Sequence, residues 1–259
     1  MTISTAIRPT GGTIVRLTFW EKPLRTSLII LTLNEIDGVR ALHDQIPFHR
    51  VDEVFAVDGG STDGTREFFT ERGIRIVEQP SRGRGEAFRI AYEAASTDAM
   101  IFFSPDGNED PADIPTFVEY LTQGYDLVIA SRMMKGAVNE EDVDVFRWRK
   151  WANQTFTLAA NGVWNRSSEY VSDTINGYRG ITKKAFAQLW PDSDGYTIEY
   201  QTSIRAMKAR LRIKEFPTNE GERIGGQSYA RSLPTGLRML RTFGRELLLG
   251  LTSPDSRSS

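Results

Sequence analysis

The feature that most constrains the fold is a repeated alternation between short apolar runs and helical patterns. Five runs rich in β-branched and aromatic residues lie at 27–33, 54–58, 74–77, 100–103 and 127–130. Between these runs, apolar residues recur at the spacing of one helix face. Continuous apolar strands that alternate with helices are typical of a mainly parallel sheet sandwiched by helices. The sequence therefore predicts an α/β fold.

The second half of the chain departs from this rhythm after residue 131. Its expected elements are a polar loop at 136–144, helices at 147–163 and 198–210, strands at 177–182 and 212–216, and a Gly-rich basic loop at 221–232. A further strand is expected at 13–19. We expect an N-terminal extension at 1–24, one domain with an elaborated second half at 25–232, and a C-terminal amphipathic helix with a mobile tail at 233–259.

Composition excludes several classes of protein. The 259 residues contain no cysteine, which excludes disulfides, thiolate metal sites and cysteine nucleophiles. His43 and His49 are the only histidines, which argues against a zinc site or a Ser-His-Asp triad. The net charge of −2 gives no signature of a nucleic-acid-binding protein. With neither a signal-peptide pattern nor a run of roughly 18 apolar residues, we expect a cytoplasmic protein, soluble or peripheral on the cytoplasmic membrane face.

Polar side chains follow three of the predicted strands at the point where each strand ends. Asn34 and Glu35 follow the first strand, 58–65 the second and 106–110 the fourth. Right-handed crossovers bring these loops to one edge of a parallel sheet, where ligands bind. Oxygen-bearing side chains there suit a hard cation such as Mg²⁺ or Mn²⁺. The alternatives are a solvated acidic turn at 106–110 and a simple helix cap at Asn34.

Two glycine-containing segments also lie between a strand and a helix. At 58–65, Asp58 is placed to accept hydrogen bonds from a base or ribose, and the alternative is a glycine-rich turn with a capped helix. At 81–85, two arginines flank a glycine before a helix, which suits a diphosphate. The alternative there is a solvated basic loop.

Five segments, taken in order, resemble the metal-dependent, inverting GT-A glycosyltransferases of family 2, and most closely the dolichyl- or polyprenyl-phosphate branch. They read LIILTLNE, VDGGSTDGT, GRGEA, FFSPDGNEDP and IASR, and the likeness spans about 27–228. The resemblance implies a Rossmann-like GT-A sheet with an elaborated acceptor side. It also implies a nucleoside-diphosphate sugar as donor and Mg²⁺ or Mn²⁺ as cofactor.

The resemblance assigns residues on the donor side. Asp106 and Asn108 are implied to hold the metal. The family's aspartate-x-aspartate box reads Ser104-Pro105-Asp106 here, so its first carboxylate is missing and Asp106 remains the principal carboxylate ligand. The residues implied to bind the donor nucleotide are Thr32, Asn34, Glu35, Asp58, Gly60, Arg82, Gly85 and Asp106.

Three later segments resemble the acceptor side of the same family: 173–179, 196–199 and 223–228. The residues implied to be catalytic are Asp106, Asp173, Arg179 and Glu199. Those implied to bind an acceptor phosphate are Arg132, Arg179, Arg223 and Ser228. A guanidinium suits bidentate phosphate recognition. The alternatives are a strand-end arginine, a glutamate at a helix start and a mobile basic loop.

The chemistry of the acceptor decides whether a general base is needed. A phosphate acceptor, whose second pKa is about 6, is already anionic and can attack the anomeric carbon directly. Asp173 or Glu199 would serve as base for a hydroxyl acceptor. We predict inverting transfer to a polyprenyl phosphate. The alternatives are transfer to a soluble hydroxyl acceptor and a nucleotide-sugar-binding protein without catalysis, which the Ser104 departure keeps open.

The C-terminal segment carries a leucine stripe. Leu237, Leu240 and Leu247 lie on one helix face together with Leu233 and Leu251, and Arg238, Arg241 and Arg245 lie largely elsewhere. Such a basic amphipathic helix can lie at a membrane surface. The alternative is that the stripe packs on the core or on a partner subunit, and an oligomer is compatible with the sequence.

Overall fold

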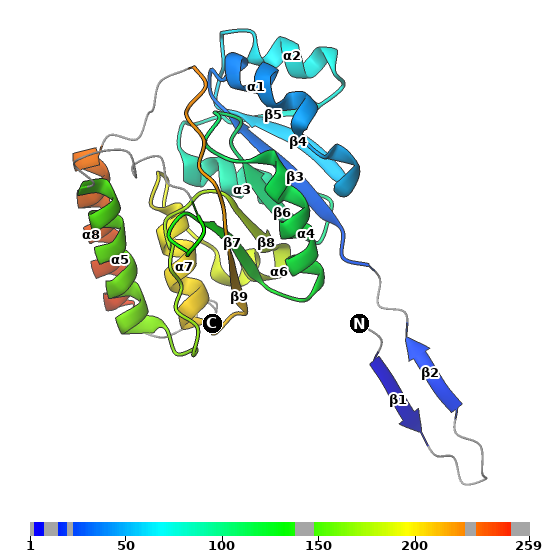
Figure 1. The fold of residues 1–259 in the computed structure, drawn as a ribbon, viewed down its shortest axis with the longest axis vertical. Coiled ribbons are helices and arrows are strands. Elements are labelled where there is room, and N and C mark those ends of the chain that lie inside the picture. The colour runs from blue at the N-terminus through cyan, green and yellow to red at the C-terminus, as the bar shows by residue number, and fades with distance from the viewer. Residues whose placement is uncertain (1–2, 8–14, 20–22, 138–147, 226–231, 250–259) are drawn as a thin grey trace.

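A seven-stranded sheet forms the centre of the molecule in the computed structural model, which describes residues 3–7, 15–19, 23–137, 148–225 and 232–249 (Figure 1). The strand order is β5-β4-β3-β6-β8-β7-β9. Its strands are β3 (Thr26–Thr32), β4 (Glu53–Asp58), β5 (Arg75–Glu78), β6 (Ala99–Phe103), β7 (Leu127–Ser131), β8 (Arg179–Thr182) and β9 (Ile213–Pro217). β8 runs antiparallel to β6 and β7, and every other neighbouring pair is parallel. The predicted α/β fold with a mainly parallel sheet is confirmed.

The described residues form eight helices. They are α1 (Ile36–Leu42), α2 (Thr65–Glu71), α3 (Arg84–Ala94), α4 (Ile114–Thr122), α5 (Trp148–Trp164), α6 (Lys183–Leu189), α7 (Ile198–Lys208) and α8 (Ser232–Leu248). Six of them lie around the sheet, while α5 and α8 pack on α7 and on each other (Figure 1). Short 3-10 turns lie at His43–Gln45, Phe48–Arg50 and Pro111–Asp113. None of the described helices is long and apolar enough to cross a membrane.

Alternating side chains of the strands build two hydrophobic clusters. On β3, Leu28 and Ile30 pack with α1, α2 and α4, whereas Ile29 packs with α3 and α5–α8. The second cluster includes Phe88 and Phe102, whose rings stack with centroids 3.8 Å apart. Since both faces of the strands are buried, the apolar runs in the sequence are continuous rather than alternating.

The neighbours β3 and β6 create the crevice on which the site is built. From β3 the chain continues to β4 and β5 on one side, and β6 starts the other side of the sheet. Such a switch point opens a crevice outside the carboxyl ends of the strands. The ends of β3, β4 and β6 therefore meet there, as the sequence predicted.

Two regions differ from expectation. The strand β2 (Val15–Phe19) pairs with β1 (Ile3–Ile7) in a separate two-stranded sheet, and β1 was not predicted from the sequence. On α8, which packs against α5 and α7, the leucine stripe points away from the core, with Leu237, Leu240 and Leu247 more than half exposed. The alternative in which this stripe packs on the core is therefore wrong for these three leucines.

Candidate active site

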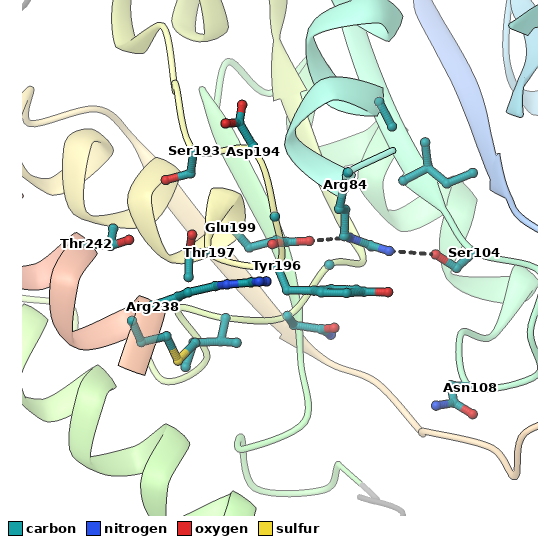
Figure 2. A pocket seen from close by; sticks show the side chains of 18 of the residues that line it. Arg84, Ser104, Asn108, Ser193, Asp194, Tyr196, Thr197, Glu199, Arg238 and Thr242 are labelled. Carbon is teal, nitrogen blue, oxygen red and sulfur yellow. Dashed lines mark hydrogen bonds and ion pairs between the residues drawn. The ribbon is translucent and has the colours of Figure 1, made fainter. Parts of the chain in front are cut away.

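A cavity of about 1170 Å³ opens at the carboxyl ends of β3, β4 and β6. Its wall is completed by the start of α3, the segment 192–199, residues of α5, the segment around Arg223 and one side of α8 (Figure 2). The cavity thus joins the strand-end loops of the first half to the helices of the second half.

The loops that follow β3 and β4 are held together by hydrogen bonds. The backbone N–H of Asn34 donates to Ser61 Oγ (2.8 Å), and Asn34 Oδ1 accepts from the N–H of Thr62 (2.8 Å). Asp63, not Asn34, accepts from the first N–H of α1, that of Ile36 (3.0 Å). Asn34 braces this edge in a left-handed conformation, with φ of 57°. The helix-cap alternative for Asn34 is therefore wrong.

Asp58 is buried and engaged by its own loop. Its carboxylate accepts from the N–H groups of Gly60 and Ser61, both at 3.0 Å, and from Thr32 Oγ1 (3.3 Å). Asp58 is 2% exposed and, like Gly60, is not part of the cavity wall. In this structure Asp58 shapes the donor loop, and a direct contact with a nucleotide stays a prediction.

Two acidic side chains, one in the loop after β3 and one in the loop after β6, form ion pairs with a single arginine. Arg223 Nη1 donates to Asp106 Oδ2 (2.6 Å), and Arg223 Nη2 donates to Glu35 Oε1 (2.5 Å). The backbone next to Arg223 is bound to the same loop, because the N–H of Ile224 donates to the carbonyl of Asp106 (2.7 Å). Burial, followed by the charge of Asp106, raises the pKa of Glu35 to about 7, against the lowering effect of Arg223.

Three buried oxygens in the cavity wall have no hydrogen-bond partner among the described residues. They are Oε2 of Glu35, Oδ1 of Asn108 and Oε2 of Glu199. Because an unsatisfied buried polar atom is costly, each of these oxygens calls for a water molecule, an ion or a ligand group as its partner. Glu35 and Asn108 lie with Asp106 at the predicted metal position.

The oxygens at this position fit a divalent cation that is coordinated partly by the protein and partly by the phosphates of a substrate. In the described part of the chain, no group of three or more His, Cys, Asp or Glu side chains could hold a metal alone. Mg²⁺, however, is commonly bound by one or two carboxylates together with substrate phosphates and water. Asp106 and the unpaired Asn108 carbonyl supply oxygens of that kind.

Ser104, which replaces the family's first carboxylate, lies in a hydrogen-bonded network that the sequence pattern did not predict. Its Oγ accepts from Arg84 Nη1 (3.3 Å), and its N–H donates to Glu109 Oε2 (2.6 Å). Arg84 also pairs with Glu199 (Figure 2). Burial raises the pKa of Glu109 to about 8 despite the opposing charge of Arg84. The sequence assigned Arg84, together with Arg82, to a diphosphate site, whereas in the structure Arg84 is engaged by Ser104 and Glu199. Glu109 was placed in the acidic turn without a role of its own.

On the acceptor side, Asp173 holds Arg132. Arg132 Nε donates to Asp173 Oδ2 (2.8 Å) and Arg132 Nη2 donates to Asp173 Oδ1 (3.2 Å), while Nη1 reaches Glu220 (3.4 Å). Burial opposes ionisation of Asp173, but the charge of Arg132 outweighs it and holds the pKa below its usual range. Arg132 lines the cavity whereas Asp173 does not. Asp173 is thus placed to orient Arg132 and poorly placed to act as a base.

Arg179 does not reach the cavity. The side chain is fully buried, and its guanidinium donates to the carbonyls of Asn176 (2.8 Å from Nε) and Glu199 (2.9 Å from Nη1). Burial lowers its pKa to about 10, which leaves it charged at neutral pH. It ties β8 to α7. The expectation that Arg179 presents its charge to an acceptor is therefore wrong.

The other implied residues divide clearly. Gly85 is required by packing, because a Cβ there would lie 1.7 Å from the carbonyl oxygen of Ser193. Ser228 lies outside the described residues. The implied residues that line the cavity are Thr32, Glu35, Arg82, Asp106, Asn108, Arg132, Glu199 and Arg223.

The fold is an open α/β sheet with a crevice at its switch point, and comparison with known proteins gives the family. The chain belongs to glycosyl transferase family 2, whose family model matches residues 27–190. This confirms the resemblance drawn from the sequence.

Two relatives and one solved structure illustrate the similarity. The chain is 27% identical over 210 residues to glycosyltransferase AglJ of Haloferax volcanii, covering 79% of this chain and 65% of AglJ. It is 29% identical over 203 residues to the dolichyl-phosphate hexose transferase of that organism, covering 77% and 84%. Glucosyl-3-phosphoglycerate synthase from Mycobacterium tuberculosis, in complex with Mn²⁺ and UDP-glucose, aligns with a TM-score of 0.64 and 25% identity, covering 87% of this chain and 78% of that chain.

Proposed function

We propose that this chain transfers a sugar, with inversion, from a nucleoside-diphosphate sugar to a polyprenyl phosphate on the cytoplasmic face of a membrane. The proposal rests on two buried oxygens that have no hydrogen-bond partner among the described residues, Glu35 Oε2 and Asn108 Oδ1. Both lie near Asp106 in the crevice between β3 and β6. Within the family, a relative named dolichyl-phosphate hexose transferase supports the acceptor class.

The donor end would hold the diphosphate and a divalent cation. Asp106 and Asn108 would hold Mg²⁺ or Mn²⁺, which when bound stabilises the charge of the departing nucleoside diphosphate. A relative in fold is described with Mn²⁺ and UDP-glucose bound. Arg82 lines the cavity next to the start of α3, where a helix N-terminus and a guanidinium together favour phosphate groups.

The acceptor end supports an anionic nucleophile. An oxygen of the acceptor phosphate would attack the anomeric carbon, and the bond from that carbon to the nucleoside diphosphate would break on the opposite face. No proton has to be removed from such an acceptor. Arg132, oriented by Asp173, would hold the phosphate, and the engagement of Asp173 as an ion-pair partner favours this route over base catalysis.

One observation favours a second candidate, transfer to a water-soluble acceptor. A relative in fold is a glucosyl-3-phosphoglycerate synthase, described with phosphoglyceric acid in one complex. Glu199 Oε2 is buried and unpaired, so it is available as a base for a hydroxyl. A binding protein without catalysis is the third candidate, since Ser104 removes one carboxylate of the metal box.

A transfer assay tests the proposal. The purified chain is incubated with labelled nucleoside-diphosphate sugars, Mn²⁺ or Mg²⁺, and either a polyprenyl phosphate or phosphoglycerate. We expect sugar in the lipid fraction, loss of that product with a chelator, and a product anomer opposite to that of the donor. Sugar transfer to phosphoglycerate alone would establish the second candidate. Donor binding without turnover on either acceptor would establish the third.

A further inference from the structure

Helix α8 presents three chemically distinct faces within its described side chains. Met239, Thr242 and Glu246 are buried against the protein. Arg238, Arg241 and Arg245, at i, i+3 and i+7, line the cavity. The apolar face lies on the outer side of the helix, opposite the buried residues, and its members are Leu237, Leu240, Leu247 and Leu248.

Two of the three arginines of the basic face have no ion-pair partner among the described residues. The cavity arginines Arg84, Arg132 and Arg223 each pair with a carboxylate, and Arg245 pairs with Asp192. Arg238 and Arg241 form no ion pair among the described residues. Both line the cavity, as does Arg82 on the donor side.

Arg238 reaches well into the cavity. Its Nη1 lies 3.6 Å from the position that a Cβ on Gly195 would occupy. Figure 2 shows the side chain pointing from α8 toward the part of the cavity that holds Tyr196 and Glu199. A guanidinium held there without a counter-charge suits an incoming phosphate.

The apolar face lies next to this basic face and is open to solvent. Leu237, Leu240 and Leu247 are 54%, 59% and 52% exposed, and Leu248 is 90% exposed. Helix α5, which packs against α8, also exposes Trp151. An apolar surface beside a basic one is the arrangement of helices that lie at an anionic membrane surface.

The position of α8 is fixed by a buried ionic network. Glu246 is 1% exposed and accepts from Arg205 Nε (2.9 Å), Lys208 Nζ (2.7 Å) and Gln201 Nε2 (3.0 Å), all on α7. This network holds the polar side of the helix inward and so turns the leucines outward. The two outer faces are therefore built into the fold.

We propose that Arg238 and Arg241 bind the phosphate of a lipid phosphate acceptor, while the leucines of α8 contact the bilayer from which that lipid comes. This inference rests on the proposed function and adds the helix that receives the acceptor. The bound lipid would then have a defined orientation, with its phosphate in the cavity beside α8 and its hydrocarbon chain at the leucine face.

The first test uses Arg238→Gln/Arg241→Gln, with Arg40→Gln/Arg50→Gln as a matched control. Arg40 and Arg50 are exposed, lie outside the cavity wall and carry the same charge. We expect the KM for a polyprenyl phosphate to rise about tenfold or more in the first variant, because charge-assisted hydrogen bonds are lost. The KM for the donor should stay within about twofold in both variants. An unchanged acceptor KM would overturn the inference and leave the proposed function standing.

Direct binding separates the inference from the proposed function. Farnesyl phosphate, phosphoglycerate and inorganic phosphate are titrated into each variant by calorimetry. We expect farnesyl phosphate to bind the parent and control proteins and to lose about tenfold or more in affinity in the α8 arginine variant. If the parent binds farnesyl phosphate through these arginines but transfers no sugar to it, the proposed function fails and the inference stands. Tighter binding of phosphoglycerate than of farnesyl phosphate would overturn the lipid assignment.

The leucine face is tested on vesicles. Leu237→Ser/Leu240→Ser/Leu247→Ser is compared with the parent for flotation with vesicles of phosphatidylethanolamine and phosphatidylglycerol, and light scattering gives the mass of each protein. We expect the parent to float with the vesicles and the variant to lose most of that binding, at equal mass. Equal flotation would overturn the assignment. A variant with half the mass of the parent would instead identify the face as an interface between two copies of this chain.

Discussion

The two ends of the cavity differ in the kind of polar group that the protein leaves without a partner: acceptor oxygens at one end and guanidinium donors at the other. At the β3–β6 crevice the unpaired groups are oxygens of Glu35 and Asn108, close to the carboxylate of Asp106. At α8 the groups without an ion-pair partner among the described residues are the guanidinium groups of Arg238 and Arg241. Oxygens of this kind suit a cation, and guanidinium groups suit an anion. A metal-bound diphosphate and a phosphate acceptor would complement these two ends.

The largest effect is expected from Asp106→Asn, which removes the only carboxylate of the predicted metal pair. Sugar transfer should fall by about 100-fold or more, because a charged group that stabilises the leaving diphosphate is lost. The KM for the acceptor should change little, since Asp106 lies at the donor end. Steady-state kinetics with each substrate varied in turn provide the measurement.

A matched control for this variant is Asp44→Asn, an exposed carboxylate outside the cavity wall. It should retain parental activity. Full activity in Asp106→Asn would remove Asp106 from the site and break the contrast between the two ends of the cavity.

Asp173→Asn tests the acceptor end. Because the variant leaves the partly buried Arg132 without its bidentate partner, we expect the free energy of unfolding to fall by about 3 kcal/mol. We also expect the acceptor KM to rise about tenfold. A general base would behave differently: its loss would lower kcat by about 100-fold or more with little change in KM. Denaturant unfolding and a kcat–KM comparison distinguish the two roles.

Glu109→Gln is expected to change the pH dependence of stability in the ligand-free protein. The pKa of Glu109 is raised from 4.5 to about 8, so the folded chain binds more protons than the unfolded chain within that window. Stability therefore falls as pH rises from 4.5 to 8, and Glu35, with a pKa of about 7, adds to the decline. Removing the carboxylate should raise the free energy of unfolding at pH 8 by about 1 kcal/mol.

Melting curves at a series of pH values give the measurement. A glutamine can still accept the hydrogen bond from the Ser104 N–H, so the loop is expected to keep its shape. A decline in stability with pH as steep as in the parent would show that Glu109 does not carry the effect.

The sheet and its crevice could be predicted because local pattern determines them. The apolar runs at 54–58 and 100–103 are buried on both faces, and β4 and β6 begin and end within one residue of these runs. Right-handed connections then require the polar loops after β3, β4 and β6 to meet at one edge. Glu35 and Asp106, which follow two of these strands, accordingly lie close enough to contact one arginine. That this arginine is Arg223, which the sequence assigned to an acceptor phosphate, was not predicted.

Side-chain direction in the second half could not be predicted in the same way. Arg179 stands at a strand end in the sequence, but its charge turns toward backbone carbonyls near α7, a helix that begins many residues later. The pairing of Arg84 with Glu199 joins residues 115 positions apart. The partners of these arginines depend on tertiary packing, which the local spacing of apolar residues does not reveal.

The orientation of α8 teaches the same point. Its leucines have the spacing of a core-facing stripe. The stripe faces outward because Glu246 forms a buried network with Arg205 and Lys208 on α7. The sequence offered a signal only in retrospect, since a lone glutamate among arginines on one helix suggests an ion pair with another element.

The central claim, that the donor end takes a cation only together with a diphosphate, is tested most directly by the melting temperature of the parent protein with Mn²⁺, UDP, or both. Because the described residues offer too few ligands to hold a metal alone, we predict a small rise with Mn²⁺ and a much larger rise with Mn²⁺ and UDP together. In Asp106→Asn the extra rise should disappear. If Mn²⁺ alone raised the melting temperature as much as Mn²⁺ with UDP, or if UDP gave its full effect without metal, the claim would be contradicted.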